Sequence, residues 1–154
     1  MLPGSPHPTI VNPQTIRAAA ALPAAGAWDA APTAFVIAIN RTVTLWFAYT
    51  RGAVGGAFDF QIQTSPYGAV VAGVENWFDQ SVYQPGAVGG GADVMSSVQR
   101  EYVRYIATGA AAEDFVFGPV TLSGDIERFR VRARESGVVG TPGTLQIIGT
   151  VFTL

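Results

Sequence analysis

Four arginines alternate with other residues in segment 126–135, IERFRVRARE, and their spacing is the clearest chemical pattern in the chain. In a β-strand every second side chain projects from the same face, about 6.6 to 6.8 Å from the next. That geometry would place four guanidinium groups in one row: Arg128, Arg130, Arg132 and Arg134. Guanidinium groups donate paired hydrogen bonds to carboxylates and phosphates. The row therefore predicts an anion-binding strip or a charged subunit interface.

Three interpretations of this arginine row are open. As a solvated outer face, it would pair with acidic residues of neighbouring strands, for which Glu101, Glu113 and Asp114 are the candidates. As an interface, it would contact another subunit. Nucleic acid is the third interpretation, but a net charge of -2 provides no overall positive field for a polyanion. We therefore expect no nucleic-acid partner.

Residues suited to catalysis are scarce. The chain has one His and no Cys, and all nine of its basic residues are Arg. A nucleotide-binding P-loop needs a Lys, and His7 lies between two prolines, remote from any Ser and Asp pairing. The acidic pairs Glu113–Asp114 and Asp125/Glu127 are more typical of solvated strand ends than of a glycosidase. The sequence predicts that the protein is not an enzyme and has no catalytic residues, cofactor or metal.

Aromatic residues support a second binding hypothesis. Exposed rings can stack on sugars or anchor a protein interface, whereas Trp46 is expected in the core. Four rings fall in predicted loops or strand edges: Trp28, Trp77, Phe78 and Tyr83. A secreted carbohydrate-binding β-sandwich module is therefore the alternative function. The run 89–93, GGGAD, resembles a calcium-binding glycine repeat but occurs once, so it predicts no metal site.

Strands are the elements that must position these residues. From residue 34 onward apolar residues recur near every second position, between Gly and Pro breaks. Segments 18–22 and 109–112 are predicted as short helices or edge segments. The predicted strands are 35–39, 43–49, 58–64, 97–106, 115–122, 126–134 and 144–152, of which 97–106 also fits a helical pattern. This pattern, without βαβ alternation, predicts an all-β fold, a single-domain β-sandwich or jelly roll.

The sequence makes specific predictions for two connections and for one strand. The short link 40–41 predicts a hairpin between segments 35–39 and 43–49. Strand 58–64 should have a buried face with Phe58, Phe60 and Ile62 and a solvated face with Asp59, Gln61 and Gln63. The last two strands are also expected to form a hairpin. The arginine row would then lie beside Gln146, Ile148 and Thr150 of the last strand, or beside the residues on the opposite face of that strand.

The N-terminal residues have a different character from the rest. Residues 1–14 contain four prolines, which lack an amide donor and favour extended backbone, so they predict an extended N-terminal arm. The arm would precede one β-sandwich domain spanning 15–154, an ordinary size for a domain. We expect the arm to lie on a neighbouring subunit through three apolar anchors: Leu2, Ile10 and Val11.

The chain has few charges for a domain of its size. Charged residues make up 13% of the sequence, against about 25% in typical domains. Much of the surface must then consist of small or uncharged residues, which are easily desolvated against a partner. The charge-free stretch 136–154 is interrupted by glycines and a proline, so no membrane partner is predicted. Self-association is the expectation.

Four segments resemble small all-β structural proteins of tailed bacteriophages, which decorate capsids or form parts of tails. The segments are GAW at 26–28, TLWFAYT at 44–50, FDFQIQTSP at 58–66 and ERFRVRARESGVVGTPGTLQI at 127–147. The resemblance implies a noncatalytic homo-oligomer, often a trimer, bound to a larger lattice such as a capsid or tail. It implies a virion or similar extracellular location, and it assigns no site residues.

Overall fold

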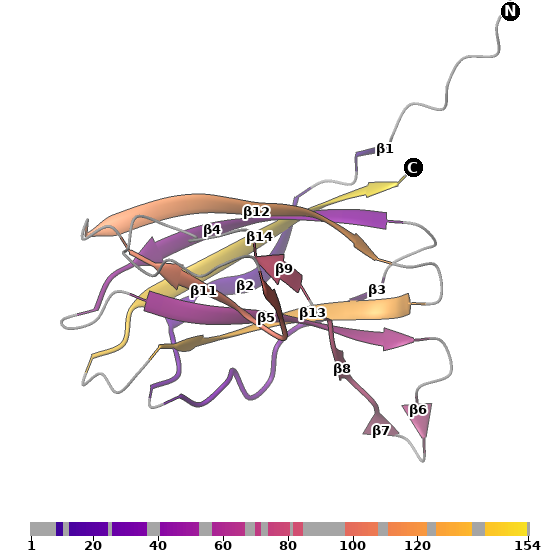
Figure 1. The fold of residues 1–154 in the computed structure, drawn as a ribbon, viewed down its shortest axis with the longest axis horizontal. Coiled ribbons are helices and arrows are strands. Elements are labelled where there is room, and N and C mark those ends of the chain that lie inside the picture. The colour runs from indigo at the N-terminus through magenta and orange to yellow at the C-terminus, as the bar shows by residue number, and fades with distance from the viewer. Residues whose placement is uncertain are drawn as a thin grey trace, which may run out of the picture.

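A computed structural model of the chain describes most of its residues. Within them there is no helix, and therefore none long and apolar enough to cross a membrane. Two antiparallel sheets face each other in a β-sandwich arrangement (Figure 1), which confirms the predicted all-β class. The described residues are 9–10, 13–24, 26–36, 41–52, 57–66, 70–71, 74–80, 82–84, 98–107, 111–122, 126–136 and 141–153.

Sheet A is built around the last strand of the chain. Its order is β2, β14, β4 and β12, and β1 pairs with the far end of β14. Thr9 and Ile10 thus lie beside Thr153 and Phe152 of the same chain. Leu2 and Val11 lie outside the described residues. The strands are β1 (Thr9–Ile10), β2 (Gln14–Ala21), β4 (Arg41–Thr50), β12 (Ala112–Leu122) and β14 (Thr144–Thr153).

Sheet B contains the strand with the arginine row. Its order is β11, β5, β13 and β3, and β8 pairs with the end of β5. Two short ribbons, β6 with β7 and β9 with β10, lie outside the two sheets. The strands of sheet B are β3 (Ala34–Val36), β5 (Ala57–Pro66), β8 (Phe78–Asp79), β11 (Val103–Ile106) and β13 (Ile126–Glu135); the ribbons are β6 (Val70–Val71), β7 (Val74–Glu75), β9 (Val82–Gln84) and β10 (Val98–Arg100).

The chain passes repeatedly from one sheet to the other. β3 pairs with β13 in sheet B, whereas β4 pairs with β12 and β14 in sheet A, so the predicted first hairpin is wrong. The predicted last hairpin is also wrong, because β13 pairs with β5 while β14 pairs with β4. Facing sheets lie about 10 Å apart, a gap that a few residues span. A short link can therefore cross from one sheet to the other as well as form a hairpin within one sheet.

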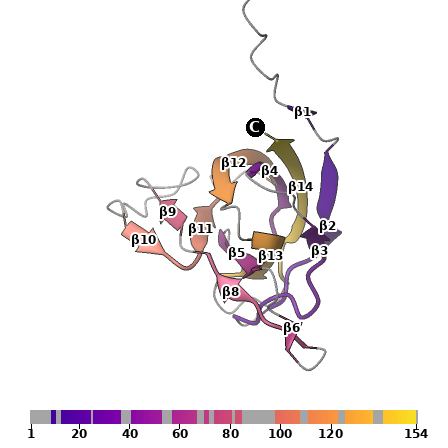
Figure 2. The same cartoon turned by 90° about the vertical axis from the view of Figure 1, so that its right-hand side faces the viewer.

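The core fills the space between the two sheets. Figure 2 looks along the strands, with β12, β4 and β14 on one side and β11, β5 and β13 on the other. Aromatic rings dominate the centre: the ring centroids of Phe47 and Phe60 are 4.5 Å apart, and those of Tyr105 and Phe115 are 4.3 Å apart. Trp46 is not in this core, because strand alternation turns Phe47 inward and Trp46 outward.

Two uncertain segments are resolved as strands. Segment 18–22 belongs largely to β2, which lies at one edge of sheet A and is not helical. The predicted strand 97–106 is divided into β10 and β11, with Glu101 and Tyr102 between them. β10 pairs with β9, whereas β11 pairs with β5. The break lets Tyr102 lie over the outer face of sheet B, while Val103 and Tyr105 are buried.

Candidate functional site

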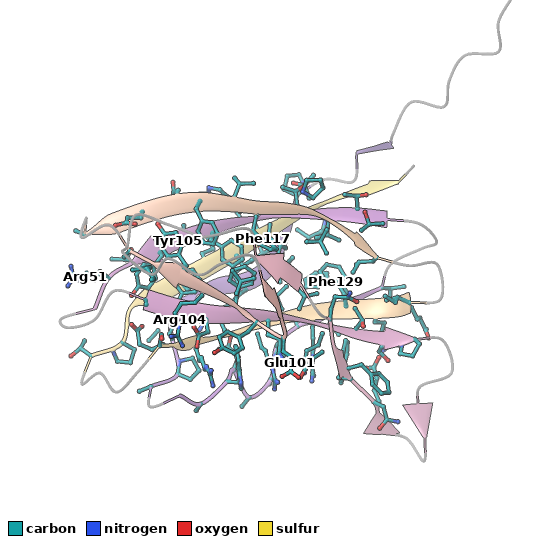
Figure 3. The ribbon with its side chains drawn as sticks, viewed as in Figure 1. Arg51, Glu101, Arg104, Tyr105, Phe117 and Phe129 are labelled. Atoms are coloured by element: carbon teal, nitrogen blue, oxygen red, sulfur yellow. The ribbon has the colours of Figure 1, made fainter. Side chains whose placement is uncertain are left out.

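The four arginines of β13 project from the outer face of sheet B, opposite a row of polar residues on β5. The two strands pair in a register that sets each arginine beside a polar partner. Figure 3 illustrates the two sides of this sheet: Tyr105 and Phe129 lie between the sheets, whereas Arg104 lies on the outer side. The pairs are Arg128 with Ser65, Arg130 with Gln63, Arg132 with Gln61, and Arg134 with Asp59.

Three of these pairs are hydrogen-bonded through the guanidinium Nε. Arg130 donates to Oε1 of Gln63 at 2.8 Å, and Arg132 donates to Oε1 of Gln61 at 2.6 Å. Arg134 donates to Oδ2 of Asp59 at 3.0 Å. The two strands are therefore joined on this face by a row of side-chain hydrogen bonds in addition to their backbone ladder.

Asp59 is the most buried charge in the row. It is 1% exposed, and its carboxylate lies between two arginines from the strands on either side. Arg104 of β11 approaches Oδ1 at 2.8 Å, and Arg134 of β13 approaches Oδ2 at 3.0 Å. A buried carboxylate is costly unless it is paired and hydrogen-bonded. Asp59 on β5 thus links β11 and β13 to its own strand through two ion pairs.

Further acids lie beyond the central strands. Asp79 of β8 accepts from Nε2 of Gln63 at 2.7 Å and lies 3.7 Å from Arg132. Glu75 lies 3.3 Å from Arg128. The partners expected from sequence are wrong in two cases, since Glu113 and Asp114 belong to β12 in sheet A. Glu113 instead accepts a hydrogen bond from the hydroxyl of Tyr105.

Aromatic rings cover the arginines from outside. The guanidinium carbon of Arg134 lies 4.2 Å from the ring centroid of Trp28, and that of Arg132 lies 4.9 Å from it. Arg130 lies 4.2 Å from the ring of Trp77. We call this set the arginine layer; its members are Trp28, Asp59, Gln61, Gln63, Trp77, Tyr102, Arg104, Arg128, Arg130, Arg132 and Arg134.

The loops that hold the two tryptophans are fixed to sheet B. The backbone N–H of Asp29 donates to the carbonyl of Ala133, and the Ala133 N–H donates back to the Asp29 carboxylate, both at 3.0 Å. This pairing sets Trp28 above the end of β13. Trp77 precedes β8, which pairs with β5 and sets its ring over the middle of the row.

The arginine layer buries the polar face of β5. Asp59, Gln61, Gln63 and Ser65 are all buried, so the prediction of a solvated face on this strand is wrong. The physical reason is the covering by guanidinium groups and indole rings, which come from segments far away in sequence. Burial lowers the pKa of Arg130, and the neighbouring charge of Arg132 lowers it further.

A buried acid, Glu135, joins the two sheets at the end of β13. It is 1% exposed, and its oxygens accept hydrogen bonds from the Tyr49 hydroxyl at 3.3 Å and the Gly143 N–H at 3.0 Å. Burial raises its pKa above the ordinary 4.5, the two hydrogen bonds oppose the rise, and the charge of Asp59 adds to it. Burial and Glu135 raise the pKa of Tyr49.

The outer face of sheet A has the opposite character. Val116, Trp46 and Ile148 lie side by side across β12, β4 and β14. Among the described side chains that project outward from these strands, Asp114 is the only charged one. We call this surface the uncharged face; it consists of Thr44, Trp46, Ala48, Val116, Gln146, Ile148 and Thr150.

A cavity of about 250 Å³ lies between β2 and the segment before β3. Most of its lining is Ala, Pro, Thr, Ile and Val, and its two charges pair with each other: Arg17 Nε lies 2.9 Å from Asp29. Arg17 also donates to the carbonyls of Ala20, Ala21 and Leu145. The guanidinium group of Arg17 is therefore hydrogen-bonded within the chain.

Neither a metal-binding group in the described residues nor a match to a known protein assigns a function to this chain. In the described part of the chain, no group of three or more His, Cys, Asp or Glu side chains gathers in a way that could hold a metal ion. The run 89–93 lies outside that part, as does His7. Comparison with known proteins finds no matching family model, curated protein or solved structure.

Proposed function

We propose that the chain is a noncatalytic structural protein of a virion or similar extracellular assembly, a capsid decoration or tail component. It self-associates and docks on a larger protein lattice. The expected state is a homo-oligomer, with a trimer as the first candidate, without nucleic-acid or membrane partners. The N-terminal arm contributes contacts to a neighbouring subunit in this proposal.

The strand order of the two sheets carries this proposal. Numbering the eight main strands along the chain, from β2 to β5 and from β11 to β14, sheet A has the order 1-8-3-6 and sheet B the order 2-7-4-5. This order supports a jelly roll, a fold in which the chain crosses repeatedly between two facing sheets. Jelly-roll domains recur in viral capsids and in lectins.

The surface chemistry supports the structural role within that class. A fold alone does not define a function, so the surfaces must be considered with it. In the arginine layer, Arg104, Arg128, Arg132 and Arg134 are paired with acids and Arg130 is bonded to Gln63, whereas the uncharged face has little that would resist desolvation. The uncharged face is therefore the surface suited to contact with other proteins.

One observation favours the carbohydrate-binding alternative. Phe78 is 56% exposed and follows Trp77 in sequence, so an aromatic surface is open at the edge of sheet B. Trp28 and Trp77 are less suited to sugar stacking, because each ring stacks on a guanidinium group. The side chain of Tyr83 lies outside the described residues.

The state of the purified chain tests the proposal. We expect discrete oligomers or filaments in light scattering and in electron micrographs of negatively stained samples. A strict monomer at millimolar concentration would contradict the structural role. If that monomer is also retained on a polysaccharide column and eluted by free sugar, the carbohydrate-binding module is the correct function.

A further inference from the structure

We infer that the uncharged face of sheet A is the surface through which two copies of this chain pair. The inference rests on the proposed self-association, takes a two-fold pair in place of a trimer as its unit, and names the surface responsible for it. It starts from three residues in one row across the sheet: Val116, Trp46 and Ile148. Val116 is 62% exposed, which is unusual for a valine in the middle of an eleven-residue strand.

Charge is divided sharply between the two outer faces. The arginine layer covers sheet B with guanidinium and carboxylate groups, whereas the uncharged face consists of Thr, Ala, Gln, Trp, Ile and Val. Apart from Asp114 on the edge strand β12, burying that face against a partner desolvates no charged side chain among its described residues. Threonine and valine also lose little side-chain freedom on contact, since their χ1 is already restricted.

A second copy of this chain is the partner whose surface matches the uncharged face. An uncharged face is complementary to another uncharged face, and among the described strands this chain offers one on sheet A and not on sheet B. A two-fold axis along β4 at Trp46 would set the two Trp46 rings against each other and Val116 of one copy against Ile148 of the second, so that each copy uses the same patch. Asp114 is on the edge strand β12, where it would lie in the solvated rim.

The size of the face is at the lower end of what a stable pair needs. A ten-residue strand such as β4 is about 33 Å long, and the three strands that form the face are about 14 Å wide, which gives roughly 460 Å² of flat area. The relief of the side chains increases the accessible area toward the roughly 800 Å² per partner of a standard interface. A mostly apolar centre with threonine around it has the layout of such interfaces.

Two valines on opposite faces provide a matched test. Val116 is 62% exposed on sheet A, and Val36 is 72% exposed on β3 of sheet B, in register with Arg128. In analytical ultracentrifugation of the full chain, we expect Val116→Glu to raise the dissociation constant about 100-fold, as for a charge desolvated without a partner. We expect Val36→Glu to leave the sedimenting mass unchanged.

A second variant covers the case in which Val116→Glu does not fold. Gln146→Glu adds a charge to the same face without changing the shape of the side chain, and circular dichroism checks the fold of each variant. If the unmodified chain associates while both sheet A variants associate equally well, the inference is wrong and the proposed function stands. If Val36→Glu alone dissociates the oligomer, sheet B is the interface. A monomeric unmodified chain overturns the inference together with the proposed self-association.

Discussion

Asp59 is a single residue on which three strands depend. Its buried carboxylate is shared by Arg104 and Arg134, whose side chains remain partly exposed. We expect Asp59→Asn to lower the free energy of unfolding by about 2 to 3 kcal/mol, somewhat less than for a fully buried pair, because the two arginines can reach water. Urea denaturation measures the loss.

Asp79→Asn is the matched control for this substitution. Asp79 is 34% exposed and lies 3.7 Å from Arg132, so its loss should cost only about 0 to 1 kcal/mol. Equal losses in the two variants would show that burial of the carboxylate is not what makes Asp59 important.

A second residue, Glu135, makes the free energy of unfolding depend on pH. Because its pKa is raised in the folded state, the folded chain binds more protons than the unfolded chain between pH 4.5 and that raised value. This acid therefore contributes a decrease in the free energy of unfolding as pH rises through that window. We expect the decrease to be smaller in Glu135→Gln, measured by urea denaturation at several pH values from about 4 to 8. Identical pH dependence in both proteins would contradict a raised pKa for Glu135.

At the scale of elements, β5 is unusual because both of its faces are buried. One face is covered by the core and the other by the arginine layer. The two tryptophans differ in how much of that layer they cover, since Trp28 lies over two arginines of β13 and Trp77 over one. The covering of β5 is thus uneven along its length.

Replacing the two tryptophans separately tests this covering. We expect Trp28→Ala to lower the free energy of unfolding by roughly 2 to 3 kcal/mol and Trp77→Ala by roughly 1 to 2 kcal/mol, from lost packing and cation–π contacts. Thermal or urea unfolding of the two variants gives the comparison. A larger loss for Trp77 would mean that the cover over Arg130 matters more than the cover over the end of β13.

At the scale of the whole molecule, the division of charge between the two faces predicts how assembly responds to salt. Salt screens ion pairs at the surface but does not weaken apolar burial. We expect the sedimenting mass of the assembled chain to persist from about 0.1 M to 1 M sodium chloride, where the screening length falls from about 10 Å to 3 Å. Dissociation in high salt would instead favour the arginine row as the interface.

Local patterns made the strands predictable. Alternation in 126–134 and 144–152 locates β13 and β14 closely, because the side-chain period of a strand is visible in a few residues. The common face of the four arginines follows from the same period. Partners were not predictable in this way: Asp59, Gln61 and Gln63 stand about seventy residues before the arginines that they bind.

The sequence by itself determined that this protein is all-β, poor in charge and marked by one row of arginines, since composition and period are local properties. Only the tertiary structure decided which strands share a sheet, because a short link can turn within a sheet or cross the gap to the facing one. That choice placed β13 beside β5 and not beside β14. It covered the arginine row and left Trp46, Val116 and Ile148 together on an uncharged outer face, because pairing across a sheet is set by how the whole chain buries its apolar side chains.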